Sequence, residues 1–382
     1  MDVQASSPLE HFDRLREHEP MAWDARTRSW YVTRYEDVSA LLVDSRLGAR
    51  RVEYCPADLS EAQRDTYWML MGFVDRWPVF SDPPRHTALR HLLRRLFVPA
   101  VTQRVTATVA AVVRERCRDV QSDRLFADVV RPALQFGLAD LLEEDTADLA
   151  QLATWASRIL SIGSIETYRA EDGEEARKTL AEFGHFVEGR CAVGDGVLAT
   201  ALREGMASGE LDLSDATATY AQLVTGALEP SAAAAAVLLQ ELTRERADRE
   251  RISANLDDAV TEALRLATPF HLAPRRALSD IPLRGQVMAE GDRVVLVLAA
   301  ANRDPRRFSD PLDFRLGRQD GLHLAFGRGR HACLGAGLTR GTMEAVVREL
   351  IAAEAVGKLP PLQPDWDEGF GARFARGMSR SD

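Results

Sequence analysis

The sequence predicts a mainly α-helical protein with a small β region. Residues 100–207 are almost entirely segments in which apolar side chains recur at helical spacing. Short stretches rich in Val, Trp and Tyr, typical of strands, occur around residues 21–33 and 273–298. Neither an internal repeat nor a Gly/Ser-rich linker divides the chain, so we expect one domain over residues 1–382.

Composition excludes several classes of protein. The 382 residues carry a formal net charge of -10, whereas nucleic-acid binders usually present a basic footprint. The four cysteines form no CxxC pair, which argues against a disulfide framework. The first residues have neither a basic start nor an apolar core, so they do not resemble a signal peptide. We therefore expect a monomeric cytoplasmic protein that binds neither nucleic acid nor membrane.

The elements of the first half follow in order. A helix is expected over 8–18 behind Ser7, then strands at 21–23 and 29–33, then a helix over 35–42. The segment 59–80 is rich in aromatic residues and Met without clean periodicity. It is either a loop that covers the core or a lid over an apolar ligand. Further helices are predicted over 100–120, 125–142, 147–161, 174–190 and 197–207.

A long apolar helix is predicted over 217–243. It is long enough to suggest a membrane span, but it contains Glu229, Pro230 and Gln222, which favour a buried core helix. Pro230 has no N–H to donate to the carbonyl of Gly226. An acid in this apolar run is either functional or paired elsewhere in the core.

The last third combines one helix with short strands. The helix spans 255–266, and Glu262 and Arg265 lie three residues apart on one face of it. Strands follow at 273–277, 281–283 and 293–298, and residues 370–380 form at most a small hairpin.

One cysteine lies among four glycines in Phe326-Gly-Arg-Gly-Arg-His-Ala-Cys-Leu-Gly-Ala-Gly337. Glycines around a reactive side chain indicate close approach of the backbone to a flat or bulky group. A helix follows Gly337, and its dipole favours a thiolate at Cys333. Elsewhere, His86 and Arg90 lie four apart on a predicted helix that begins after Pro83-Pro84, and they form a cationic face.

Together these motifs resemble those of the cytochrome P450 family. The run from Phe326 to Gly335 matches the family's FGxGxHxCLG loop, and Glu262 and Arg265 match its ExxR helix. Residues 82–90 match the DPPxHTxxR helix of soluble bacterial members, and residues 301–305 match as well. The resemblance implies a P450 fold that binds haem b (iron protoporphyrin IX) through Cys333 as axial thiolate.

The resemblance also assigns the surrounding residues. Phe326, Gly327 and Gly335 would surround the thiolate, and Glu262 and Arg265 would brace the scaffold. The haem propionates would be held by His86, Arg90, Arg275 and His331. The substrate pocket would include Phe270, His271, Leu272, Gly226 and Ala227.

One position departs from the family pattern. Glu229 matches an acid that helps to deliver protons during oxygen activation, but Pro230 stands where a threonine is expected. Ser231 follows about 100° further round the helix. Ser231, an ordered water or a group of the substrate could replace the threonine. Alternatively, the enzyme does not perform ordinary hydroxylation.

The expected function is oxidation of a small natural-product intermediate with O2 and electrons from a ferredoxin and its reductase. The donor would dock on a basic face containing Arg94, Arg95, Arg328, Arg330 and Arg340. Alternatives are an atypical P450 that uses peroxide, transfers nitrogen or rearranges a pre-oxidised substrate, and a catalytically silent haem carrier.

Overall fold

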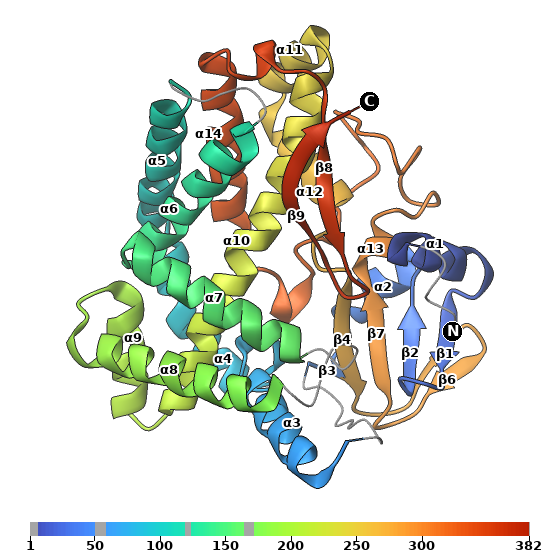
Figure 1. Ribbon diagram of the computed structural model, residues 1–382. Coiled ribbons are helices and arrows are strands. Elements are labelled where there is room, and N and C mark those ends of the chain that lie inside the picture. Colours follow the sequence, from blue (N-terminus) through green and yellow to red (C-terminus); the bar gives the residue numbers. More distant parts are fainter. Residues whose placement is uncertain (1–6, 50–58, 119–123, 164–171, 382) are drawn as a thin grey trace. The chain divides into compact units, whose positions relative to one another are not determined.

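Strands from the two ends of the chain share one five-stranded sheet, which the computed structural model shows in the order β1-β2-β7-β4-β3 (Figure 1). Strand β1 (Met21–Asp24) pairs antiparallel with β2 (Ser29–Val32), and β2 runs parallel to β7 (Arg293–Val297). Strand β4 (Leu272–Ala277) is antiparallel to both of its neighbours, β7 and β3 (Leu47–Gly48). Backbone hydrogen bonds therefore fix the N-terminal strands to the C-terminal third of the chain.

The structure describes residues 7–49, 59–118, 124–163 and 172–381, which form two compact units. The first unit contains residues 1–48, 102–137 and 228–382, and the second contains 49–101 and 138–227. Helix α10 (Leu213–Arg244) belongs to the second unit up to Ala227 and to the first from Leu228.

The remaining elements of the first unit are α1 (Pro8–His18), α2 (Tyr35–Leu41), α5 (Pro99–Arg116), η4 (Phe126–Val130), α6 (Arg131–Leu142), α11 (Arg246–Ala254), α12 (Leu256–Ala267), β5 (Ile281–Leu283), β6 (Gln286–Met288), α13 (Leu298–Ala301), η5 (Gly329–His331), α14 (Ala336–Ala352), η6 (Val356–Lys358), β8 (Leu362–Glu368) and β9 (Arg373–Arg380). Helices α5 and α6 each extend a few residues past its limits. Those of the second unit are α3 (Glu61–Val74), η1 (Pro78–Phe80), α4 (Arg85–Leu93), η2 (Arg94–Phe97), α7 (Thr146–Gly163), α8 (Asp172–Val193) and α9 (Val197–Ala207).

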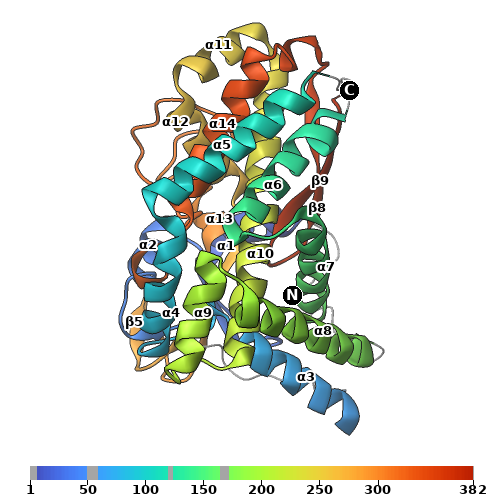
Figure 2. The ribbon, with the colours of Figure 1, turned by 90° about the vertical axis from the view of Figure 1, so that its left-hand side faces the viewer.

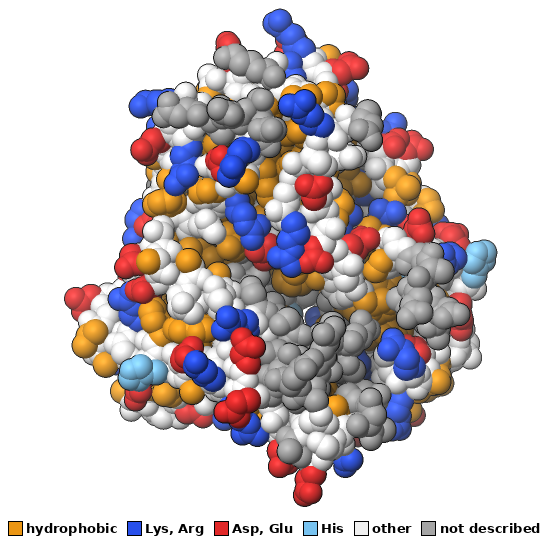
Figure 3. All heavy atoms as spheres, in the orientation of Figure 1, with side chains coloured by type: hydrophobic (Ala, Val, Ile, Leu, Met, Phe, Trp, Pro, Cys, Tyr) orange, Lys and Arg blue, Asp and Glu red, His pale blue; other side chains and the backbone are white. Residues whose placement is uncertain are grey.

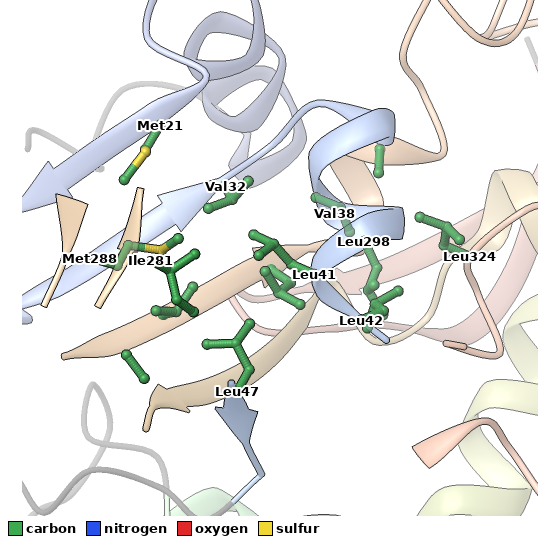
Figure 4. Packing of buried hydrophobic residues seen from close by; sticks show 14 residues of the cluster. Met21, Val32, Val38, Leu41, Leu42, Leu47, Ile281, Met288, Leu298 and Leu324 are labelled. Carbon is green, nitrogen blue, oxygen red and sulfur yellow. The ribbon is translucent and has the colours of Figure 1, made fainter. Parts of the chain in front are cut away.

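Strand β7 is buried on both faces. Val294 and Leu296 contribute to one apolar cluster, which includes residues of α2, β5 and β6 (Figure 4). Val295 and Val297 contribute to a second cluster around Phe12 of α1. Burial on both sides explains why this strand reads as a continuous apolar run rather than as an alternating one. Each such side chain stabilises the fold by about 1.5–3 kcal/mol.

Helix α5 lies beside α6 and α14 (Figure 2). A Cβ atom at Gly137 of α6 would lie 2.5 Å from the Val109 Cγ2 of α5, so the close approach of these helices depends on glycine. Toward α14, Arg114 Nε donates a hydrogen bond to Glu349 Oε2 at 3.0 Å.

The predicted strands at 21–23, 29–33, 273–277, 281–283 and 293–298 are confirmed to within two residues. The terminal hairpin is also present, but it begins at Leu362 instead of residue 370. The two-residue β3 and the three-residue β6 were not predicted, because such short strands carry little periodicity. Leu298 begins α13 instead of ending β7. The predicted helices are also present, although the end of the one at 100–120 lies outside the described residues.

The interpretation of 59–80 as a loop is wrong, because most of it forms α3. Ser60 and Gln63 make reciprocal capping bonds at its start. Tyr67, Leu70 and Met71 pack in a cluster with Ala176 of α8. The mixture of aromatic residues and Met therefore reflects packing against a neighbouring helix.

Helix α10 continues through Pro230. It is the one helix in the described part of the chain that is long and apolar enough to cross a membrane unbroken, and 61% of its most apolar window is buried. Ala232, Ala233 and Ala234 are fully buried, as expected for a core helix.

A buried carboxylate joins α12 to the loop that leads toward Cys333. Glu262 Oε1 accepts hydrogen bonds from Arg265 Nη2 at 2.8 Å, Arg318 Nε at 2.7 Å and the Arg315 N–H at 3.1 Å. Its Oε2 accepts from Arg265 Nε at 2.8 Å. The side chains of Glu262 and Arg265 are 4% and 2% exposed, so the predicted pair is a core ion pair rather than a surface one.

The guanidinium of Arg265 also holds the loop. Nη1 donates to the carbonyls of Asn302 and Pro311 at 2.8 and 2.7 Å, and Nη2 donates to that of Asp313 at 3.3 Å. Burial alone would raise the pKa of Glu262, but the hydrogen bonds from Arg265 and Arg318 outweigh it and hold the pKa below its ordinary value. Glu262 is therefore ionised at neutral pH. We call Glu262 together with Arg265, Arg315 and Arg318, which donate hydrogen bonds to it, the Glu262 node.

We expect Glu262→Gln to lower the free energy of unfolding by about 3–5 kcal/mol, because it leaves two buried guanidinium groups short of a counter-charge. The matched control is Glu250→Gln in the exposed Arg246–Glu250 pair, which we expect to cost under about 0.5 kcal/mol. Since the folded pKa of Glu262 is depressed, its contribution is present above the ordinary value of 4.5 and is lost as the pH falls through the folded value. Urea titrations at pH 7 and pH 4 check this, and equal losses for the two variants at pH 7 would contradict the assigned role.

Candidate functional site

The cysteine loop is closed by its own backbone. The N–H of Cys333 donates to the carbonyl of Phe326 at 2.9 Å, and the N–H of Gly327 donates to that of Leu324 at 2.9 Å. Helix α14 begins directly afterwards, with Gly335 as its N-cap. The loop backbone is thus fixed, while Cys333 itself is exposed. This arrangement presents an exposed sulfur atom just before the N-terminus of a helix.

Two glycines of the loop meet conformational requirements. Gly327 and Gly329 have φ of 64° and 71°, in the left-handed region that favours glycine. A Cβ at Gly329 would lie 3.1 Å from Val43 Cγ1 and 3.2 Å from the Leu42 carbonyl oxygen. The loop therefore lies directly against the end of α2. This contact, and not contact with a ligand, accounts for the glycine at position 329.

Phe326 packs between a neutral and a charged side chain. Its ring centroid lies 5.6 Å from that of His323 and 5.7 Å from the guanidinium carbon of Arg340. Burial lowers the pKa of His323 to about 4, and its Nδ1 accepts the Ala325 N–H at 3.1 Å. Arg340 is half-buried and packs against the aromatic ring at the start of the loop, and its expected place on a donor-docking face stays a prediction.

Asn302 links the cysteine loop to the Glu262 node. Its Oδ1 accepts the Leu324 N–H at 2.6 Å, and its backbone carbonyl accepts from Arg265. Its Nδ2 donates to Thr268 Oγ1 at 2.9 Å. The side chain is fully buried, so it transmits the position of α12 to the residue two places before Phe326.

The expected propionate ligands belong to both units. In the first, Arg275 is buried on β4 with Nη1 donating to the Pro274 carbonyl at 2.8 Å, and His331 is half-buried at the end of η5. In the second, His86 is buried and Arg90 half-buried on α4, one helical turn apart as predicted.

Glu229 on α10 is an ion-paired acid. Arg131, the first residue of α6, donates from Nη2 to Glu229 Oε1, and their side chains are 25% and 21% exposed. Arg131 Nη1 also contacts the Ala375 carbonyl of β9 at 3.4 Å. Oε2 of Glu229 is buried and has no hydrogen-bond partner among the described residues. One carboxylate oxygen is thus held by an arginine, whereas the other is buried and unbonded among the described residues.

The residues around Glu229 are partly open. Pro230 and Ser231 are half-buried, as is Ala227, whereas Gly226 is exposed. A Cβ built at Gly226 meets no atom within 4 Å. There is therefore room beside this turn of α10, as the predicted pocket role of Gly226 requires.

The expected pocket turn after α12 is only partly suited to a substrate. His271 is fully buried, its ring centroid lies 5.9 Å from that of Phe12, and burial lowers its pKa to about 3. It is therefore a buried neutral residue, and its predicted place in the substrate pocket stays a prediction. Leu272 packs against the same cluster, whereas Phe270 is 39% exposed.

Sequence analysis missed four participating residues. These residues are Arg131, Asn302, Arg318 and His323. The first three lie far in sequence from the groups they contact, whereas His323 contacts its neighbours Ala325 and Phe326. Asn302 belongs to the matched 301–305 motif, and this was the available indication for it. The others resemble ordinary surface or loop residues until the fold brings them together.

Comparison with known proteins agrees with this geometry. The family model for cytochrome P450 matches residues 245–353. The methyl-branched lipid omega-hydroxylase of Mycobacterium tuberculosis is 31% identical over 293 residues, which cover 71% of this chain and 67% of that protein. The 20-oxo-5-O-mycaminosyltylactone 23-monooxygenase of Streptomyces fradiae is 29% identical over 386 residues, covering 94% and 84%.

A solved structure gives the same result for the fold. P450BioI in complex with an acyl carrier protein ligated to hexadec-9Z-enoic acid superposes with a TM-score of 0.81 at 25% identity, and the match covers 97% of each chain. The chain therefore belongs to the cytochrome P450 family of oxidoreductases.

Proposed function

We propose that this P450 oxidises a small apolar natural-product or lipid-like intermediate, using O2 and electrons from a ferredoxin system in the cytoplasm. In such a reaction one oxygen atom enters the substrate and the other leaves as water, with two electrons and two protons consumed. Relatives named as a lipid hydroxylase and a monooxygenase support this class of substrate and reaction. The observation that carries the proposal is the half-partnered carboxylate of Glu229.

The residues present fit haem b. Cys333 offers a soft sulfur donor on a fixed backbone, and its exposure leaves room for a flat group. Arg275, His331, His86 and Arg90 are the cations that would pair with the propionates. When bound, haem supplies the iron centre for oxygen activation, and a thiolate ligand favours O–O cleavage.

Glu229 would supply one of the protons. Arg131 holds Oε1, which fixes the carboxyl group in place, and leaves Oε2 to exchange a proton with water or with a polar group of the substrate. Because Pro230 has no N–H, it leaves the Gly226 carbonyl without its helical hydrogen bond. A water bonded to that carbonyl could take over the proton relay. Ser231 is half-buried next to Pro230 and offers a hydroxyl on the adjoining helix face.

Pro230 also favours a second candidate. If no hydroxyl near this turn takes the place of threonine, the enzyme would use peroxide, transfer nitrogen or rearrange a pre-oxidised substrate. The candidates differ in whether O2 and a reductase are needed.

The electron donor would bind to exposed arginines, which include Arg328 and Arg330 of the cysteine loop. In the first unit Arg328 and Arg330 are exposed, and Arg328 Nη1 donates to Ser39 Oγ. In the second unit Arg94 and Arg95 are exposed on η2, and Arg95 pairs with Glu204 at 2.8 Å. An acidic ferredoxin would be attracted to these cations.

Cys333→Ala should abolish the strongly red-shifted Soret band of the reduced, CO-bound protein, because the thiolate ligand is lost. Cys117→Ala changes a half-buried thiol outside the loop and should retain the band. Persistence of the band in Cys333→Ala would show that another residue binds the iron.

Glu229→Gln should reduce product formed per NADPH by about tenfold to 100-fold and increase hydrogen peroxide release, because the proton donor is lost. Arg131→Gln should cause a smaller loss by releasing the carboxylate from its fixed position. The surface variant Glu188→Gln serves as the control. Unchanged coupling in Glu229→Gln would remove Glu229 from the mechanism.

Product formation should require O2 together with reduced ferredoxin, and Pro230→Thr should lower peroxide release. Single-turnover assays with and without O2 test the first point. Product formed anaerobically or with hydrogen peroxide alone would instead establish the atypical chemistry.

A further inference from the structure

A polar groove lies in the first unit, apart from the cysteine loop. Its volume is about 800 Å³, and it is bounded by the C-terminal part of α10, by α11, by residues 312–316 and by β8 and β9. Five arginines line it, against the two acidic side chains of Glu241 and Asp313. These arginines are Arg244, Arg251, Arg303, Arg315 and Arg373.

This excess of cations is local. The chain as a whole carries a net charge of -10. On the face drawn in Figure 3, cationic and anionic side chains are interspersed. The lining of the groove therefore holds more guanidinium groups than carboxylates, unlike the protein as a whole.

Arg373 is the unusual member. Its Nε donates to the Ala267 carbonyl at 2.9 Å, its Nη2 donates to the Leu266 carbonyl, and its guanidinium stacks 4.3 Å from the Trp366 ring centroid. Within the described part of the chain no carboxylate is hydrogen-bonded to it. Burial, with a smaller effect of Arg303, lowers its pKa to about 10 despite the opposite effect of Glu368. Arg373 is thus a charged group that lacks a directly bonded counter-ion beside an open volume.

The other arginines have partners but keep donors to spare. Arg303 pairs with Asp13 at 2.9 Å, Arg244 with Glu241 at 3.0 Å and Arg251 with Asp248 at 3.6 Å. Arg315 pairs with Asp310 at 2.5 Å. A guanidinium has five N–H donors, so each can bind a further anion without giving up its carboxylate.

We propose that this groove binds a small polyanion that carries phosphate or carboxylate groups. Arg373 and Arg303 would provide the inner contacts, and Arg251 and Arg244, whose side chains are 66% and 58% exposed, would provide the outer ones. The volume fits a ligand of metabolite size rather than a single inorganic ion. Such a ligand would contact residues 312–316, whose Asp313 carbonyl accepts from Arg265, so binding should stabilise the Glu262 node.

Pyrophosphate and citrate are the probes, titrated by calorimetry into the haem-loaded protein at an ionic strength on the order of 0.01 M, where screening is weak. Both the calorimetric dissociation constant and the melting temperature are measured. We expect saturable binding and a rise in melting temperature. A tighter complex with pyrophosphate identifies a phosphate ligand, and a tighter complex with citrate identifies a polycarboxylate.

Arg251→Met is the test variant, and Arg246→Met is its control. Both arginines are on α11, are largely exposed and pair with an acid of the same helix, but only Arg251 borders the groove. We expect Arg251→Met to weaken binding by about tenfold and Arg246→Met to leave it unchanged. Arg373→Met should abolish binding. If Arg373→Met does not fold, the exposed variant Arg251→Met still tests the proposal. Absence of binding to both probes, or equal affinity in Arg251→Met and Arg246→Met, would overturn the proposal.

Discussion

The fold around the cysteine loop depends on the complete neutralisation of one buried carboxylate. Glu262 accepts four hydrogen bonds, three of them from guanidinium groups. A carboxylate in this position is tolerated because each of its oxygens is bonded, and removing any partner would leave a buried charge. Through Arg265 and Asn302 the same node fixes the segment that leads into Phe326 and Cys333. The ionic contacts of Glu262 thereby help to position Cys333, although Glu262 does not touch the cysteine loop itself.

A second carboxylate is held in a different way. Glu229 also has an arginine partner, but only Oε1 is bonded, and Oε2 is buried without a partner in the part of the chain described. A fully bonded carboxylate stabilises, whereas a half-bonded one retains the capacity to exchange a proton. The contrast between Glu262 and Glu229 is the basis of our proposal that the first acid is structural and the second reactive. Under that proposal, the absence of threonine at Pro230 need not abolish chemistry at this turn of α10.

What the sequence could predict follows from the range of the interactions. Glu262 with Arg265, and His86 with Arg90, are within one helical turn, so helical spacing alone placed them together. The loop from Phe326 to Gly335 is likewise local, but the close approach at Gly329 is to Leu42 and Val43, which its sequence did not indicate. Arg131 contacts Glu229 and Arg318 contacts Glu262 across long sequence separations, which the periodicity of the sequence cannot predict. The burial of His271 could not be predicted either, because a histidine after a helix looks the same in sequence whether it faces a pocket or the core.

The solvent isotope effect on product formation tests the assignment of Glu229 most directly. If the carboxylate delivers a proton, its replacement by Gln makes proton transfer slower and more nearly rate-limiting. The ratio of rates in H2O and D2O should then be clearly larger in Glu229→Gln than in the wild type. An equal isotope effect in the two proteins would contradict the account, because it would mean that protons reach the reaction by another route.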